Sequence, residues 1–442
     1  MILCYFFAKS YLFVVVGIFA LASTLGFSYA QSFQTPLDLS KDIPDSHEPQ
    51  ITVAGNNVYI IWTGFGGGLE DQDDVFFKKS SDSGATFSDT INISDDRGSS
   101  FNPRMAFSGN NVYVIWQDDT GNTGNTSIFF QKSSDGGATF SDTINLSNDA
   151  GFAVNPQISK FGNSVYIIWQ DDTSGPDEIL YKRSIDNGSS FETLNISQSV
   201  DNDSIDGRIY AVDNKVYIVW TEGNFNEGRT SIFARASSDG GATFSNPINL
   251  SNNTGYANIP RVSAYGDNEY VMWMQGKFNQ GEIIFKKSSD GGATFGQSIR
   301  LSNNNGTSSN PLLLTDGRYV YSVWMSNETN KANVYSKSSS DDGITFENAK
   351  NLSRGSLGVS NPAIAGNKST IFVVWEEENT TGSNLAIRRS NDAGATFSDL
   401  INLTKNSDNS SHPAISIYNN KSYVVWQDNT HGTNHIMFTR ES

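Results

Sequence analysis

One short motif, Ser-x-Asp-x-Gly-x-Thr-Phe, recurs at nearly constant spacing along most of the sequence. Seven copies follow one another at intervals of 51 or 53 residues, and one copy carries Ser190 in place of the Thr. Their aspartates are Asp82, Asp135, Asp186, Asp239, Asp290, Asp341 and Asp392. The eight tryptophans keep the same register, at Trp62, Trp116, Trp169, Trp220, Trp273, Trp324, Trp375 and Trp426. A fixed period of this length indicates stacked supersecondary units, so the chain contains eight units, seven of which carry the motif.

Each unit is predicted to contain four short strands. In the second unit we expect them at 103–108, 111–117, 127–133 and 139–146. The second of these strands is apolar on both faces, because Val114 and Trp116 alternate with Tyr113 and Ile115. That pattern is typical of a strand buried between stacked sheets. The turn that begins at Gly109 favours a tight hairpin between the first two strands.

The segment 33–40 matches the strand that the last unit lacks. It resembles 244–251, the fourth strand of another unit, whereas the last unit stops at Ser442 before its own motif. An N-terminal strand in that place closes a ring and leaves no long sheet edge exposed. The sequence therefore predicts an all-β fold, a single eight-bladed β-propeller over residues 31–442 with four antiparallel strands per blade.

The first 30 residues predict a secretory signal peptide. Lys9 precedes an apolar run over 11–22, and Ser28-Tyr29-Ala30 forms a small-x-small cleavage site. The alternative is an uncleaved anchor, although the run is shorter than the ~20 residues of a spanning helix. We expect a secreted or cell-surface protein without stable membrane insertion after cleavage. The one cysteine, Cys4, lies in this leader, so the mature protein has no disulfide or thiolate metal site.

The charge balance is acidic, with 30 Lys and Arg against 47 Asp and Glu and a net charge of −17. Phosphate backbones repel such a chain, which excludes a nucleic-acid partner. Acidic residues gather in the predicted second-to-third loops, at Glu70, Asp71, Asp73, Asp74, Asp118, Asp119, Asp171, Asp172, Asp177, Glu178, Glu376, Glu377 and Glu378. Two interpretations stay open: a solubilising surface, or a surface for a cationic ligand or Ca²⁺. Because no run matches an EF-hand loop, we predict no cofactor and leave Ca²⁺ or another divalent metal open.

The repeated motif resembles the Asp-box of the sialidase-like, or BNR-repeat, β-propellers, and the likeness covers essentially the whole mature chain. The resemblance is specific for the fold and weak for function, because the family includes hydrolases, lectin-like proteins, receptors and assembly factors. Chemically, the Asp can accept backbone N–H bonds in the turn between the third and fourth strands. The Gly is suited to a positive φ and the Phe to packing between blades. We therefore predict structural roles for the seven aspartates and the eight tryptophans.

Sialidases of this family hold a substrate carboxylate with three arginines, attack with a Tyr paired to a Glu, and use an Asp as acid–base catalyst. In this chain an Arg follows the strand-opening Pro, or Gly207, in three units, at Arg104, Arg208 and Arg261. We expect the three at one level at the mouth of the central channel, with only Arg208 and Arg261 as neighbours, and take them as ligand-binding candidates. The Arg-Ile-Pro signature of the family is absent, and the catalytic residues stay unknown.

Histidines and sequons supply two weaker patterns. His47, His412 and His431 belong to the two blades that flank the ring closure, and imidazoles near carboxylates suit a divalent metal. The alternative is a chance cluster of exposed side chains. Sequons for N-glycosylation recur at one place in the fourth strands, at Asn92, Asn145, Asn195, Asn249, Asn351 and Asn402. They predict either glycan attachment or a pattern that the repeat itself creates.

These observations favour an exported, monomeric binding or scaffold module. Its variable loops on one face of a rigid ring would hold a glycan, peptide or protein ligand. The alternative, which the family resemblance implies, is a sialidase-like glycoside hydrolase, an exo-α-sialidase. The sequence has no Gly-x-Ser-x-Gly elbow and no Walker-type glycine loop, so Ser/His/Asp hydrolysis and nucleotide chemistry are not expected.

Overall fold

The structure is a computed structural model. It describes residues 32–442 apart from 67–71, 96–97, 120–123, 148–150, 253–254, 277–279, 303–305, 328–330, 355, 381, 405–408 and 431. The predicted signal peptide, 1–30, therefore lies outside the described residues. The stretch Phe33–Ser442 is one compact unit. Its described residues are in strands, turns and irregular segments, and they include no helix long and apolar enough to cross a membrane.

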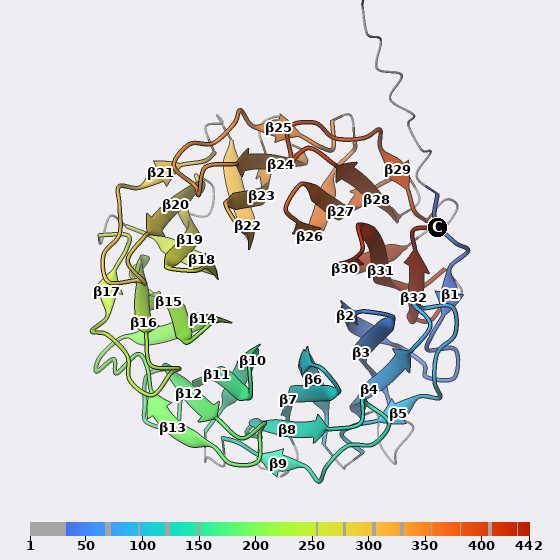
Figure 1. Ribbon diagram of the computed structural model, residues 1–442, viewed down its shortest axis with the longest axis horizontal. Helices are drawn as coiled ribbons and strands as arrows, with labels where there is room; N and C mark the ends of the chain where they lie inside the picture. The colour runs from blue at the N-terminus through green and yellow to red at the C-terminus, as the bar shows by residue number, and fades with distance from the viewer. Residues whose placement is uncertain are drawn as a thin grey trace, which may run out of the picture. The chain divides into compact units, whose positions relative to one another are not determined.

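Eight four-stranded antiparallel sheets are arranged as the blades of a closed ring, in line with the prediction (Figure 1). We number the blades 1 to 8 along the chain. Their innermost strands are β2 (His47–Ala54), β6 (Ser100–Ser108), β10 (Ala153–Phe161), β14 (Asp203–Val212), β18 (Ala257–Tyr265), β22 (Thr307–Asp316), β26 (Val359–Asn367) and β30 (Ser410–Tyr418). The second strands are β3 (Asn57–Phe65), β7 (Asn111–Asp118), β11 (Ser164–Asp171), β15 (Lys215–Asn224), β19 (Asn268–Gln275), β23 (Tyr319–Asn327), β27 (Thr370–Glu378) and β31 (Lys421–Asp428).

In each blade the third strand is no longer than either inner strand, and the outermost strand is the shortest. The third strands are β4 (Asp73–Ser80), β8 (Ser127–Ser133), β12 (Glu178–Ser184), β16 (Arg229–Ser237), β20 (Glu282–Ser288), β24 (Ala332–Ser339), β28 (Ser383–Ser390) and β32 (His435–Arg440). The outermost strands are β5 (Ile91–Asn92), β9 (Ile144–Asn145), β13 (Glu192–Asn195), β17 (Ile248–Asn249), β21 (Ile299–Arg300), β25 (Lys350–Asn351), β29 (Ile401–Asn402) and, for blade 8, β1 (Leu37–Asp38).

Two strand boundaries predicted for the second unit are wrong. The innermost strand β6 begins at Ser100 rather than Pro103, because Ser100 still pairs with Asp118 across a β-bulge. The outermost strand β9 covers two residues rather than 139–146. Before it, the Ser141 N–H donates to the Lys132 carbonyl while the Ser141 hydroxyl accepts the Lys132 N–H, which replaces the regular ladder by a local side-chain bond.

The predicted closure of the ring by the N-terminal strand is confirmed. In β1, Leu37 pairs with Phe438 of β32, and Phe33 forms a further antiparallel bridge to Glu441 (Figure 1). Leu39 is buried in the core cluster that joins blades 8 and 1. Blade 8 is therefore built from both ends of the propeller, and the outer edge of β32 is covered.

The tryptophans and the motif residues form the contacts between blades. All eight indoles are 0 or 1% exposed, so their predicted core role is confirmed. Within blade 2, Trp116 stacks on Phe129 with ring centroids 5.9 Å apart. The motif phenylalanine Phe140 packs edge-on against Phe77 of blade 1, at a centroid distance of 5.1 Å. Trp stacks recur in blades 1, 4 and 6, and edge-on contacts of motif phenylalanines also join blade 1 to blade 8, blade 3 to blade 2, blade 4 to blade 3 and blade 6 to blade 5.

A second repeated device explains the sequon pattern. In blade 2 the Ser147 hydroxyl accepts the N–H of Ile128 on the third strand, at 3.1 Å. The same bond forms in every blade, to the hydroxyls of Ser94, Ser147, Ser197, Ser251, Ser302, Ser353, Thr404 and, through the closing strand, Ser40. The Asn of the sequon is replaced by Arg300 in blade 5 and by Asp38 in blade 8, yet the hydroxyl is kept. The Ser or Thr of these sequons therefore has a structural role that needs no glycan.

Candidate functional site

Each innermost strand is interrupted by a β-bulge near its start. The register shifts at this point in all eight blades, and the bulged residue has a positive φ between 45° and 55°. These residues are Glu48, Asn102, Asn155, Asp206, Ile259, Asn310, Asn361 and His412. A Pro follows seven of them and Gly207 follows Asp206. A bulge re-aims the side chains beside it, so it sets what the strand presents to the central channel.

Sequence analysis missed this bulge, although its signal was present. The Pro that recurs at the start of the first strand cannot donate to the ladder, and a Pro inside a strand marks a bulge or an edge. The residue before it is most often Asn, which tolerates a positive φ well. Together the two residue types would have located the bulge in each unit.

The residue after the Pro or Gly207 occupies the same register position in every blade. It pairs with the residue that precedes the Trp, as Arg104 does with Ile115. We call these eight positions the first channel level: Gln50, Arg104, Gln157, Arg208, Arg261, Leu312, Ala363 and Ala414. The structure thus places the three candidate arginines at one level of the ring, on β6, β14 and β18.

The three guanidinium groups have no acidic partner. Each is half-buried, and each donates a hydrogen bond to the carbonyl of the residue before it, at 2.9 to 3.0 Å. Among the described residues, none of the three forms an ion pair. Within the part of the chain that the structure describes, their hydrogen bonds go to neutral carbonyl oxygens, so no described acid compensates their positive charge at short range.

The arginines act on one another electrostatically. Burial is the largest cause of the lowered pKa of Arg261, which falls to about 9, and the charges of Arg208 and Arg104 lower it further. Burial and the charge of Arg208 also lower the pKa of Arg104. The expectation that only Arg208 and Arg261 are neighbours stays a prediction: β14 and β18 are adjacent innermost strands, whereas β10 lies between β6 and β14, although the charge of Arg208 still reaches Arg104. At pH 7 all three stay charged.

Two carboxylates partly offset this cationic group from a distance. The charge of Asp206 raises the pKa values of Arg208 and Arg261, and that of Glu48 raises the pKa of Arg104. Neither carboxylate comes within 4 Å of an arginine nitrogen. Glu48 is instead used as a link between blades 1 and 2, because it accepts the Asn102 N–H at 3.0 Å.

Arg104 lines a cavity of about 280 Å³ beside the channel. Its wall is formed by the bulges of blades 1, 2, 7 and 8, with Glu48, Asn102, Asn361 and His412 among its polar residues. The bulge of blade 8 is held in place by Glu376, which accepts the backbone N–H of His412. The cavity therefore has rigid walls that come from four separate blades.

Part of the predicted acidic loop surface is wrong. Asp118 is 1% exposed and accepts hydrogen bonds from the Ser100 hydroxyl and from the Trp116 indole, at 2.5 and 3.2 Å. Asp171 accepts the Trp169 indole N–H in the same way. Other buried members are Asp74, Glu178 and Glu376, while Glu70 and Asp71 lie outside the described residues. Asp118, Asp171, Glu222 and Asp428 are structural because each accepts the indole N–H of the Trp two residues before it. Glu377 differs, because the Trp375 indole has no partner among the described residues.

The histidines are placed as follows. The His47 ring lies 3.8 Å from an Asp73 oxygen and 3.0 Å from the Asp45 carbonyl, whereas His412 lines the channel cavity. His431 lies outside the described residues. Within the described ranges, no three His, Cys, Asp or Glu side chains gather as a metal would require. The metal hypothesis gains no support here and stays a prediction.

The seven motif aspartates have their oxygens engaged within the turn. In blade 4, one Asp239 oxygen accepts the Ser237 hydroxyl and the N–H groups of Ala242 and Thr243, and the other accepts the Thr243 hydroxyl. The Thr hydroxyl and amide are the main causes that lower the pKa of Asp290 and Asp341 to about 2. A carboxylate that accepts three or four hydrogen bonds within its own turn holds that turn, which supports the structural role predicted for the motif aspartates.

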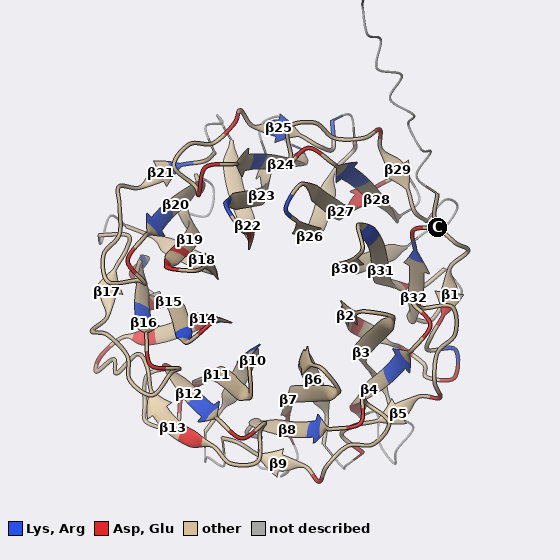
Figure 2. Ribbon diagram, in the orientation of Figure 1, with Lys and Arg blue, Asp and Glu red and all other residues tan. Residues whose placement is uncertain are grey.

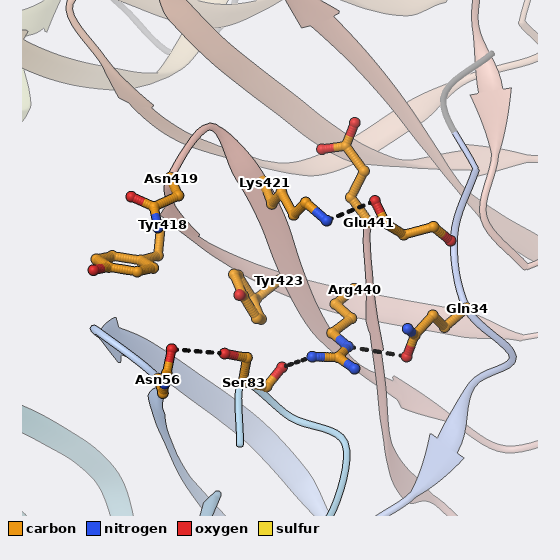
Figure 3. Close-up of a pocket in the computed structure, with 10 residues that line it drawn as sticks. Gln34, Asn56, Ser83, Tyr418, Asn419, Lys421, Tyr423, Arg440 and Glu441 are labelled. Carbon is orange, nitrogen blue, oxygen red and sulfur yellow. Dashed lines mark hydrogen bonds between the residues drawn. The ribbon is translucent and has the colours of Figure 1, made fainter. Parts of the chain in front are cut away.

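A second cavity, of about 300 Å³, lies at the seam of the ring (Figure 3). The basic side chains that line this cavity already form hydrogen bonds within the protein. Arg440 donates to the Gln34 side chain and to the Ser83 carbonyl, and Lys421 donates to the Ser442 carbonyl. These bonds tie the closing strand to blades 8 and 1. We therefore take the arginine group of the channel, and not the seam, as the candidate site.

Comparisons with known proteins fit this architecture. Residues 216–425 match the family model described as a BNR repeat-like domain, and no curated protein matches the chain. The Trypanosoma rangeli sialidase with 2,3-difluorosialic acid is 14% identical with a TM-score of 0.37; the match covers 65% of this chain and only 53% of that one. The NanB sialidase of Streptococcus pneumoniae is 12% identical with a TM-score of 0.38, over 93% of this chain and 70% of that one. The polysaccharide lyase Uly1 is 9% identical with a TM-score of 0.49, over 96% and 94%.

Proposed function

The chain is a sialidase-like, BNR-repeat β-propeller, and from that premise we propose that it is an exported binding module for a ligand that carries a carboxylate. The ligand, an acidic glycan, peptide or small acid, binds at the first channel level. One observation supports the proposal above all others: Arg104, Arg208 and Arg261 come from three blades, influence one another electrostatically and form no ion pair with any described residue.

The physical reason is the cost of uncompensated charge. Partly buried guanidinium groups that repel one another raise the free energy of the empty site, and a carboxylate among them offsets that cost. Arginine is suited to this task because its planar fork donates two parallel hydrogen bonds to one carboxylate. The remainder of the chain carries a large excess of acid, so a ligand carboxylate is attracted only close to this group.

The alternative is a sialidase-like glycoside hydrolase, since three arginines for one carboxylate is also the substrate contact that the family resemblance implies. Such an enzyme further needs a nucleophile and an acid–base carboxyl group beside the bound sugar. Nothing in the described site assigns these roles, so binding is the proposal and hydrolysis is the competing outcome.

The test is calorimetric titration of the mature protein with a panel of carboxylates: acetate, hexanoate, glucuronate and N-acetylneuraminate. Arg208→Gln should weaken any panel member that binds by at least tenfold, because Arg208 lies within the field of both other arginines. Arg354→Gln is the matched control, since Arg354 is exposed and lies outside the channel level. If no panel member binds in a manner that depends on Arg208, the proposal is wrong.

Hydrolysis is tested in the same preparation by release of a fluorophore from a sialyl conjugate. We expect no turnover above the buffer control. Turnover that disappears in Arg261→Ala and survives in Arg354→Gln would replace binding by catalysis as the function of the site.

A further inference from the structure

The channel wall is divided into a cationic and an apolar arc. At the first channel level the arginines and glutamines occupy blades 1 to 5, whereas blades 6, 7 and 8 present Leu312, Ala363 and Ala414. Two residues further along the strands, blades 6 and 7 again carry apolar residues: Leu314, which is half-buried, and Ala365, which is buried. The innermost strands β26 and β30 contain no Lys, Arg, Asp or Glu, and Figure 2 draws them without charge.

The two arcs adjoin one another at both ends. Arg261 on β18 is followed around the ring by Leu312 on β22, the next innermost strand. At the other end, the cavity of about 280 Å³ has Arg104 on one side and Pro362, Pro413 and Ala414 on the other. A molecule that places an acidic group among the arginines therefore has apolar wall beside it in either direction.

Two polar side chains of the apolar arc, Asn361 and Asn310, already contact other protein groups. The Asn361 amide donates to Glu376 at 2.7 Å, and the Asn310 amide lies 3.4 Å from the Met325 sulfur. Leu314 is half-buried and belongs to none of the core clusters, whereas Leu312 and Ala363, also half-buried, pack in part against the cores between blades. Sugar hydroxyls laid along this arc would lose their bonds to water, whereas methylene groups would gain by leaving water.

We propose that the preferred ligand is an amphipathic organic acid, with its carboxylate among the arginines and an aliphatic body along Leu312, Leu314 and Ala363. This inference rests on the proposed function and narrows it from any carboxylate to one chemical class. The arginines supply the anchor for the acid, and the arc of blades 6 to 8 selects the body of the ligand by excluding water rather than by hydrogen bonding.

The experiment compares octanoate with acetate, glucuronate and octanol, each titrated into the mature protein at one ionic strength. Octanoate should bind at least tenfold more tightly than acetate and glucuronate. Octanol, which has the same chain without the charge, should bind at least tenfold more weakly than octanoate. Arg208→Gln should weaken octanoate and glucuronate alike.

Two variants separate the narrower inference from the proposed function. Leu314→Ser should weaken octanoate three- to tenfold and leave glucuronate unchanged, and Ala363→Ser, a smaller change, should act in the same direction if the first variant does not fold. Glucuronate that binds as tightly as octanoate, or octanoate binding that is insensitive to both variants, overturns the inference and leaves the proposed function standing. Absence of any Arg208-dependent binding overturns both.

Discussion

The backbone of Gly137 in blade 2 lies directly against the ring of Phe77 in blade 1. A Cβ added to Gly137 would come within 2.5 Å of the Phe77 Cζ atom. Gly84 of blade 1 has the same relationship to Phe438 of blade 8, across the closure of the ring. A glycine is therefore needed at this motif position for two reasons: neighbouring blades approach its Cα closely, and its backbone has a positive φ.

Substitution of Gly137 tests this contact. Gly137→Ala combines strain at a φ of 78° with a clash against a buried ring, and we expect it to lower the free energy of unfolding by about 2–4 kcal/mol. Gly109→Ala is the matched control, because Gly109 has a φ of 58° but open space around it, and should cost only about 1–2 kcal/mol. Urea unfolding measures both, and equal costs would contradict the proposed contact.

The motif serine is a second test, within a single turn. The buried Ser237 hydroxyl accepts the N–H of Gly241 at 2.8 Å and donates to Asp239. Ser237→Ala leaves that buried N–H without a partner and should lower the free energy of unfolding by about 1–3 kcal/mol. Ser238→Ala, next to it and exposed, should change little. Carboxylate affinity should be the same in both variants; a loss of binding in Ser237→Ala would place the motif near the ligand.

Glu269 carries a prediction on pH. It is fully buried on β19 where most other blades have Val, and neither of its carboxyl oxygens has a hydrogen-bond partner among the described residues. The Tyr217 hydroxyl facing it from β15 is also unpartnered, and an added Cβ on Gly292 would lie 2.6 Å from Glu269 Oε2. Burial, and secondarily the charge of Asp290, raise the pKa of Glu269 well above its ordinary value.

The sign of this pH dependence follows from whether the folded or the unfolded state binds the proton of Glu269. The folded protein keeps Glu269 protonated, while the unfolded chain ionises it above pH ~4.3, so the contribution of this group to stability is lost as the pH rises. Relative to Glu269→Gln, the wild type should lose about 1.4 kcal/mol per pH unit above that point until the folded pKa is reached. Urea unfolding at pH 5, 6 and 7 measures the difference, and a constant offset between the two proteins would refute it.

The ring closure is tested by shortening the chain. A protein that starts at Asp42 lacks β1 and the Leu39 side chain, so the outer edge of β32 and the core between blades 8 and 1 are exposed. We expect a lower melting temperature than that of the protein starting at Gln31. Equal melting temperatures would mean that the segment adds nothing to the ring.

Among the described residues, the bulge of blade 5 is the one place where a β-branched residue has a positive φ. Ile259 has a φ of 54°, at a position where four other blades have Asn. Ile259→Asn should therefore raise the free energy of unfolding by about 1 kcal/mol or more, and Asn310→Ile should lower it by a similar amount. Thermal unfolding measures the stability of both variants. If Ile259→Asn and Asn310→Ile both lower the free energy of unfolding, the packing of the Ile259 side chain outweighs its backbone strain.

Much of the fold could be predicted because each blade repeats the same short-range pattern. The spacing of the motif, the alternation around Trp116 and the likeness of residues 33–40 to a fourth strand are all readable within or between single repeats. Strand ends were less predictable. The outermost strands shrink to a few residues because Ser141 and its counterparts bond to the third strand through side chains, and no hydrophobic period records such bonds.

The candidate site was predictable only in part. That Arg104, Arg208 and Arg261 share one register follows from the repeat, but their mutual influence depends on how far apart blades 2, 4 and 5 lie around the ring. The acids after the Trp were misread as surface because an Asp that serves a buried indole looks the same in sequence as one that faces water.

By itself, the sequence determined the number of blades, the tryptophan core, the braced turns and the strand that closes the ring, since each is recorded within one repeat or in the likeness of one repeat to another. Only the tertiary structure decided which channel residues stand side by side, which acids are buried, and that a cationic arc adjoins an apolar one. The arrangement of the channel joins residues about 50 or more positions apart, and burial of the acids depends on the packing of whole blades, so both are set by the closed ring rather than by local pattern.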